Sequence, residues 1–213
     1  MARAIREEKR GSRKRNTHPV VIIVCEGAKT EPIYFNHFKK RDKPLRIEVV
    51  KDAAGESYRA LIKAAIGAKE KYVNGTESNW AVWCVSDVDV DHNTPDNQSL
   101  RSSQLKAYAK EATQNGFRVA LSNPCFELWF LLHFTYTTGH VRDCDTLIEK
   151  LSKYIPKYKK DSGIYNLLAD KQCNAISNGK KLENYHQEQG KSDMIDVSVN
   201  PYTNVWELVE ALI

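Results

Sequence analysis

Two apolar runs in this sequence are closely followed by acidic residues, and this pattern restricts both the fold and the function of the chain. The first run, VVIIVC, ends before Glu26, and the second, WAVWCV, leads into Asp87, Asp89 and Asp91. Nearly continuous apolar runs of this length are typical of strands that are covered on both faces of a parallel sheet. Ligands bind at the carboxyl ends of strands in open α/β sheets. Carboxylates delivered there by two strands therefore indicate a site for a divalent cation.

Strand and helix signals alternate along the first part of the chain. We expect strands over 19–25, 45–51, 79–87 and 117–121, and helices over 30–40, 57–72 and 99–115. The third helix is expected to end at Gly116, because glycine commonly follows a helix C-terminus. This order predicts an α/β fold, in which a parallel sheet with right-handed crossovers carries helices on both faces.

From residue 123 onward the pattern becomes helical. Apolar or amphipathic stretches cover 124–134, 145–154, 164–187 and 203–213. A chain of 213 residues can bury a substantial single core. We therefore expect one domain over 19–213, with an α/β core at 19–122 and a mainly helical extension at 123–213 packed on it.

The N-terminal segment, residues 1–18, is basic and lies outside this pattern. Its first 15 residues hold seven Lys or Arg and two Glu, a net charge of +5, which equals the net charge of the whole chain. The remainder is therefore neutral overall. Two interpretations stay open: a solvated, disordered terminus, or an arm that contacts the phosphates of a nucleic acid.

Hydropathy and the number of cysteines indicate in which cellular compartment the protein is located. No run approaches the roughly 20 apolar residues of a membrane span, and no apolar stretch follows the basic N-terminus as in a secretory signal. The five cysteines are odd in number and include no Cys-x-x-Cys pair. We therefore expect a reduced, cytoplasmic protein with no membrane contact, no disulfide framework and no structural zinc site.

The acidic residues after the second run have a spacing that suits metal ligands. Side chains alternate along a strand, so Asp87, Asp89 and Asp91 share one face, with neighbouring Cα atoms roughly 6.5 Å apart. Mg²⁺ prefers one or two carboxylates together with waters and phosphate oxygens, and a cation offsets the repulsion between such close negative charges. With Glu26 from the first strand, these residues form the expected site for Mg²⁺, or for Mn²⁺ in its place. An acidic turn without a metal remains the alternative.

Three further residues are candidates for contacts with a substrate phosphate. Gly27 permits close approach of the backbone in the turn after the first strand, where the next helix offers its amides to an anion. Lys29 lies in the same turn, although a solvated surface lysine explains it equally well. His92 directly follows the three aspartates.

Asn123 and Glu127 follow the fourth expected strand. Asn123 is expected to cap the next helix, with Pro124 in its first turn, and it is the fourth candidate for a phosphate contact. Glu127 then lies near the same edge of the sheet. It either complements the helix dipole or serves as a ligand for a second cation.

Four motifs, taken in order, resemble one protein family. They are CEGAKTEPIYF from Cys25, the Asp87/Asp89/Asp91 pattern, SNPCFELW from Ser122 and NPYTNV from Asn200. Over about residues 19–213 the chain is similar to the RloB family, whose members are Toprim-like proteins associated with bacterial restriction and abortive phage defence. The Glu-Gly and Asp-x-Asp-x-Asp motifs also resemble the Toprim domain of topoisomerases, primases and overcoming-lysogenization-defect nucleases.

This resemblance implies a Toprim-like sheet and a magnesium site. Glu26 matches the Toprim glutamate, which is expected to act in acid/base chemistry or metal binding. Asp87 and Asp89 match the metal-binding pair, and Asp91 is a third acidic member. Toprim relatives cut nucleic acid or join strands, and those in defence systems often work beside an ATPase.

The expected function is therefore a Mg²⁺-dependent, Toprim-type nuclease that hydrolyses phosphodiester bonds of DNA or RNA in bacterial anti-phage defence, with Glu26, Asp87 and Asp89 as its catalytic residues. The alternative is a non-catalytic module of a defence system that senses a nucleotide or a partner. A third interpretation is transfer or hydrolysis on a small phosphorylated metabolite. The sequence leaves the nucleic acid, the trigger, the number of metals and the oligomeric state open.

Overall fold

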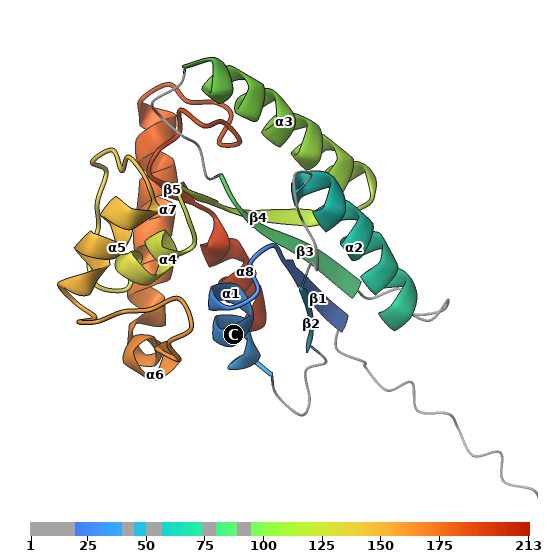
Figure 1. Ribbon diagram of the computed structural model, residues 1–213, viewed down its shortest axis with the longest axis horizontal. Helices are drawn as coiled ribbons and strands as arrows, with labels where there is room; N and C mark the ends of the chain where they lie inside the picture. The colour runs from blue at the N-terminus through green and yellow to red at the C-terminus, as the bar shows by residue number, and fades with distance from the viewer. Residues whose placement is uncertain (1–19, 40–44, 50–56, 74–79, 89–94) are drawn as a thin grey trace, which may run out of the picture.

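The computed structural model describes residues 20–39, 45–49, 57–73, 80–88 and 95–213. Its centre is a five-stranded sheet in the order β2-β1-β3-β4-β5, with helices on both faces (Figure 1). The strands are β1 (Val20–Cys25), β2 (Leu45–Val49), β3 (Trp80–Asp87), β4 (Arg118–Asn123) and β5 (Tyr202–Thr203). The first four are parallel, and β5 pairs antiparallel with β4. The predicted α/β fold with a mainly parallel sheet is therefore confirmed.

The helices around this sheet follow the predicted ranges in part. They are α1 (Thr30–Asn36), α2 (Ser57–Tyr72), α3 (Pro95–Gln114), α4 (Glu127–Leu132), α5 (Cys144–Ser152), α6 (Tyr165–Leu168), α7 (Gln172–Glu188) and α8 (Val205–Leu212), with a 3-10 turn at Ala169–Lys171. α2 has the predicted bounds, and α3 ends as predicted before Gly116, whose φ of 74° suits glycine. The single helix predicted over 164–187 is instead divided between α6 and α7 by the 3-10 turn.

The register of the sheet places the ends of β1 and β3 side by side. Cys25 pairs with Val85, and the backbone N–H of Glu26 donates to the carbonyl of Val85 at 3.1 Å. β3 continues beyond this pair to Asp87. Glu26 and Asp87 thus leave neighbouring parallel strands at the same edge of the sheet, as the sequence predicts.

Alternate residues of β1 enter two different hydrophobic layers. Ile22 and Val24 pack with side chains of α2 and α3, which lie together on one face of the sheet (Figure 1). Ile23 and Cys25 belong to the layer on the other face, which includes side chains of α1, α4 and α8. Because both faces are covered, β1 is apolar along its length rather than alternating between apolar and polar residues.

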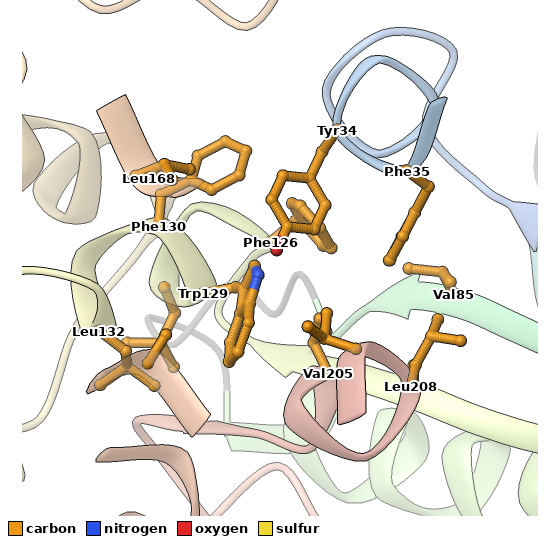
Figure 2. Packing of buried hydrophobic residues seen from close by; sticks show 14 of the residues in the cluster. Tyr34, Phe35, Val85, Phe126, Trp129, Phe130, Leu132, Leu168, Val205 and Leu208 are labelled. Atoms are coloured by element: carbon orange, nitrogen blue, oxygen red, sulfur yellow. The ribbon is translucent and has the colours of Figure 1, made fainter. Parts of the chain in front are cut away.

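Aromatic side chains join the sheet to the C-terminal helices. Figure 2 shows Trp129 of α4 among Tyr34 of α1, Val85 of β3 and Leu208 of α8, all of which belong to one buried cluster. The Tyr34 hydroxyl donates to Oε1 of Gln172 in α7 at 2.9 Å. Four helices therefore share one core with the sheet, and this core fixes α4 against the ends of the strands.

The junction between β4 and α4 differs from the prediction. α4 begins at Glu127, after Phe126. Asn123 is the last residue of β4, and its side-chain amide donates to the carbonyls of Val197 and Val199 at 3.0 and 2.8 Å. The predicted cap by Asn123 is wrong, because this amide binds the segment that precedes β5.

The cysteines also depart from the expectation. Cys125 and Cys144 form a disulfide, whereas Cys25 and Cys84 are buried thiols and Cys173 is an exposed one. The expectation of a fully reduced chain is therefore wrong at one pair. Packing of α4 against α5 brings together two cysteines that are 19 residues apart in sequence, a proximity that their spacing does not reveal.

Among the helices that the structure describes, none is both long and apolar enough to cross a membrane.

Candidate functional site

A pocket of about 300 Å³ lies at the carboxyl edge of the sheet. It is bounded by the turn between β1 and α1, the end of β3, the start of α4 and the segment that follows α5. Its lining residues are Gly27, Ala28, Lys29, Thr30, Glu31, Asp87, Phe126, Glu127 and Lys160. Segments that are far apart in the sequence thus meet where β1 and β3 end.

Three carboxylates line this pocket, and Glu26 adds negative charge beside them. Glu31 and Glu127 are only 4% and 2% exposed. Burial raises the pKa of Asp87 well above its ordinary value, and the charges of Glu31, Glu127 and Glu26 raise it further. Lys160 acts in the opposite direction on the same pKa. The pocket therefore concentrates negative charge in a poorly solvated space.

Gly27 and Glu31 form one local unit in the turn after β1. The backbone N–H of Gly27 donates to Oε1 of Glu31 at 3.2 Å. A Cβ atom at position 27 would overlap the Glu31 carboxylate, so the close approach of this carboxylate requires glycine. Burial raises the pKa of Glu31, backbone hydrogen bonds oppose that shift, and the charge of Glu127 adds to it.

The segment between α5 and α6 is tied to the pocket by two hydrogen bonds. The Tyr158 hydroxyl donates to Oε1 of Glu127 at 3.0 Å, and the Thr30 hydroxyl donates to the carbonyl of Lys160 at 3.1 Å. Burial and the neighbouring Glu127 raise the pKa of Tyr158, so its hydroxyl keeps its proton and remains a donor. This segment therefore fixes one oxygen of Glu127 and brings Lys160 to the pocket.

Asp87 is held by its backbone, while one of its carboxylate oxygens lacks a hydrogen bond. The Tyr58 hydroxyl donates to the backbone carbonyl of Asp87 at 3.2 Å. The side-chain Oδ1 is buried and has no hydrogen-bond partner among the described residues. Buried polar atoms are normally paired, and an unpaired carboxylate oxygen beside Glu31 and Glu127 has the chemistry of a ligand for a hard cation. The donor chemistry of these carboxylates therefore suits Mg²⁺.

The structure brings five of the predicted site residues together. Gly27, Lys29, Asp87 and Glu127 line the pocket, and the charge of Glu26 acts on the carboxylates inside it. Glu127 starts α4 and also lines the pocket together with Asp87.

Four predicted site residues are not in this group. Asn123 is 1% exposed, its amide donates to two carbonyls of the interior, and it does not line the pocket, so its predicted phosphate contact stays a prediction. Asp89, Asp91 and His92 lie outside the described residues, and their predicted roles stay predictions.

Sequence reasoning missed Glu31 and Lys160. The sequence does give an indication for Glu31, because this residue follows the end of the first apolar run closely. An acidic residue in the first turn of a helix is also common for electrostatic reasons, however. Lys160 had no signal, because it reaches the pocket from a loop that precedes α6 and only the tertiary structure brings it there.

Comparison with known families matches residues 21–212 to the RloB-like protein family. The chain belongs to this family. Every residue that lines the pocket of this RloB-like chain falls within the matched range. No curated protein and no solved structure matches the chain significantly.

Proposed function

We propose that this RloB-like chain is a Mg²⁺-dependent, Toprim-type nuclease that hydrolyses phosphodiester bonds of DNA or RNA in the bacterial cytoplasm during anti-phage defence. Asp87, Glu31 and Glu127 hold the cation, and Mn²⁺ can replace Mg²⁺. The observation that carries this proposal is the buried Oδ1 of Asp87, which has no hydrogen-bond partner among the described residues and lies among other carboxylates.

Each residue around the pocket has a distinct part in the proposed reaction. When bound, the divalent cation activates water for attack and stabilises the leaving oxygen. Glu26 accepts the proton of the attacking water at the edge of the pocket, as a general base. The ammonium group of Lys160 pairs with a non-bridging oxygen of the scissile phosphate, while the Thr30 hydroxyl holds the Lys160 backbone in place.

A basic rim supports nucleic acid as the substrate. We define this rim as Lys29, Lys157, Lys159 and Lys160, all of which are exposed. Lys29 and Lys160 also line the pocket. Tyr158 lies within the same segment and donates to Glu127, so this hydrogen bond ties the segment that carries Lys157, Lys159 and Lys160 to a residue of the pocket. Lysines at such positions attract the phosphates of a polynucleotide.

Metal binding is the first test. We expect calorimetric titration with MnCl₂ to show one or more sites in the wild type and at least roughly tenfold weaker binding after Asp87→Asn or Glu31→Gln, which is the loss of about 1.4 kcal/mol. Glu183→Gln is the matched control, because burial also raises the pKa of Glu183, but this residue does not line the pocket. Wild-type affinity in both pocket variants would contradict the proposal.

Cleavage is the second test. Linear DNA, single-stranded RNA and tRNA are incubated with the wild type in MgCl₂ or in EDTA, and Asp87→Asn serves as the inactive variant. We expect Mg²⁺-dependent cleavage of at least one substrate by the wild type. Metal binding without cleavage of any substrate would refute the nuclease and favour the alternative, a module that senses a nucleotide or a partner.

The basic rim has its own test. Lys160→Ala is expected to weaken nucleic acid binding and to reduce the slope of log K against log salt by about 0.9 on duplex DNA or about 0.7 on a single strand. Lys153→Ala removes an exposed lysine of the same segment that does not line the pocket, and it is expected to change the slope less. Equal slopes for both variants would mean that Lys160 does not contact the phosphates.

A further inference from the structure

The Cys125–Cys144 disulfide lies directly against the acidic pocket. Cys125 precedes α4 and Cys144 is the first residue of α5, with their Cα atoms 5.7 Å apart. Sγ of Cys144 lies 3.5 Å from Oε2 of Glu127. The other carboxylate oxygen of Glu127 accepts a hydrogen bond from Tyr158. One oxygen of a pocket carboxylate is thus held by tyrosine and the other faces a sulfur atom.

The redox state of this sulfur decides whether it can bind Glu127. A thiol carries a hydrogen and donates to a carboxylate, whereas a disulfide sulfur has no hydrogen to donate. In the reduced protein, Oε2 of Glu127 therefore accepts a hydrogen bond from Cys144. In the oxidised protein this oxygen loses that donor and is available to another ligand in the pocket.

We propose that Cys125 and Cys144 form a reversible thiol–disulfide site, oxidised by small-molecule disulfides, that controls how Glu127 binds the cation. The consequence for catalysis rests on the proposed metal-dependent function. Oxidation would strengthen cation binding, because Oε2 of Glu127 no longer accepts a hydrogen bond from a competing S–H group. The redox reaction itself requires no metal.

The exposure of the two sulfurs sets the order of the exchange. Cys144 is half-buried, whereas Cys125 is 3% exposed. Cys144 therefore attacks the small-molecule disulfide first, releases one thiol and forms a mixed disulfide. Cys125 then attacks the Cys144 sulfur and releases the second thiol. Two electrons and two protons pass from the protein to the small molecule, which becomes two thiols.

The remaining three cysteines lie outside this pair. Cys25 and Cys84 are 0% exposed, and Cys173 is exposed but forms no disulfide. Cys173→Ser is therefore the matched control, since it removes an accessible thiol away from the pair. The expected thiol count in the unfolded wild type is five when the protein is reduced and three when the pair is oxidised.

The first experiment tests the redox site without metal. Full-length protein is equilibrated in EDTA with mixtures of oxidised and reduced glutathione, quenched with acid and analysed for free thiols by mass spectrometry. We expect a reversible transition between five and three thiols. Glu127→Gln should shift the equilibrium between dithiol and disulfide toward the disulfide by roughly fivefold, because the reduced form loses a hydrogen bond to a charged acceptor. Cys173→Ser should leave the midpoint of the transition unchanged.

Two results would contradict the proposal. A full set of reactive thiols at every glutathione ratio would refute the redox site, and an unchanged midpoint in Glu127→Gln would refute its coupling to the carboxylate. Neither result depends on nuclease activity or on metal binding.

The second experiment measures Mn²⁺ affinity in the two redox states. We expect the oxidised wild type to bind Mn²⁺ roughly fivefold more tightly than the reduced one, the effect of one hydrogen bond. Cys144→Ser keeps a donor and cannot form the disulfide, so it should resemble the reduced state under both conditions. Cys144→Ala has neither donor nor disulfide and should bind Mn²⁺ more tightly than Cys144→Ser.

The outcomes separate this inference from the proposed function. Equal Mn²⁺ affinity in both redox states, or in Cys144→Ser and Cys144→Ala, would refute control of the cation by the cysteine pair. Absence of Mn²⁺ binding in every state would instead refute the proposed function and with it the control of the cation, and the glutathione titration would still decide whether the redox site exists.

Discussion

Asp87→Asn is expected to stabilise the metal-free protein while it removes the proposed metal site. The Asp87 carboxylate is buried among other carboxylates, and its Oδ1 has no hydrogen-bond partner among the described residues. Its backbone carbonyl, in contrast, is bound by Tyr58, and the substitution leaves that bond intact. An unpaired buried acceptor costs about 1–3 kcal/mol, and more when it is charged. The neutral amide removes the charge and offers an N–H donor to the neighbouring carboxylates.

The size of this stabilisation depends on pH in a definite direction. The folded-state pKa of Asp87 is raised, so the folded protein keeps a proton that the unfolded chain releases above pH about 4. The stability of the metal-free wild type therefore falls as pH rises from about 4 toward the folded-state pKa, and the loss is complete above it. The raised pKa of Glu31 contributes with the same sign. The gain from Asp87→Asn is consequently small near pH 4 and grows as the pH rises toward the folded-state pKa of Asp87.

Thermal unfolding in EDTA at several pH values measures this effect. A gain of about 2 kcal/mol corresponds to an increase of roughly 4–8 °C in Tm for a chain of this size. Asp170→Asn is the control, because the Asp170 side chain is 73% exposed and pairs with the neighbouring Lys171, and the substitution should change the stability by less than about 0.5 kcal/mol.

A metal titration completes the experiment. Mn²⁺ at about 100 times its Kd for the wild type should stabilise the wild type by about 2.7 kcal/mol, and it should stabilise Asp87→Asn, which binds at least roughly tenfold more weakly, by about 1.4 kcal/mol or less. A lower Tm for Asp87→Asn than for the wild type in EDTA at pH 8 would show that the fold stabilises this carboxylate. In that case the explanation from burial and charge repulsion is wrong.

Three further predictions concern the pocket and the N-terminal arm. Gly27→Ala should weaken Mn²⁺ binding about tenfold with little change in Tm, because the new Cβ displaces only the flexible carboxylate of Glu31; unchanged affinity in calorimetry would contradict this. Glu26→Gln should keep Tm within a few degrees and abolish cleavage in a gel assay, and retained activity would move the general base elsewhere. Deletion of residues 1–15, which hold seven Lys or Arg, should weaken nucleic acid binding and make its salt dependence shallower, whereas an identical slope would mean that the arm does not contact phosphates.

The sheet could be predicted because its strands carry strong local signals. β1 and the first six residues of β3 are apolar, and this pattern is typical of strands covered on both faces. β5 has only two residues and gains its place by pairing Thr203 with Ser122 across the edge of the sheet. Such a pairing depends on the packing of α7 and α8, so no local pattern in the sequence could reveal it.

The site could be predicted only where the sheet itself assembles it. Glu26 and Asp87 were expected to meet, because neighbouring parallel strands deliver their ends to one edge. Lys160 and Tyr158 reach the same pocket from a loop between helices, and hydrogen bonds to Thr30 and Glu127 hold them there. Long-range contacts of this kind leave no trace in residue spacing. Asn123 was wrongly predicted to cap a helix, because a polar residue at the end of a strand can also form hydrogen bonds inside the protein.

The end of β3 explains how the fold holds a repulsive group of carboxylates without using their oxygens. The backbone N–H of Val88 donates to the carbonyl of Ser122 at 2.8 Å, and Nε of Arg101 donates to the carbonyl of Val88 at 2.9 Å. The Arg101 guanidinium also lies over the ring of Tyr58, 4.4 Å from its centroid, and Tyr58 binds the Asp87 carbonyl. All three bonds engage backbone groups, so α2 and α3 orient Asp87 from the opposite face of the sheet. Because this support does not depend on the carboxylate, the oxygens of the Asp87 side chain remain available to a ligand. Tyr58 of α2 and Arg101 of α3 are therefore positioning residues for the site.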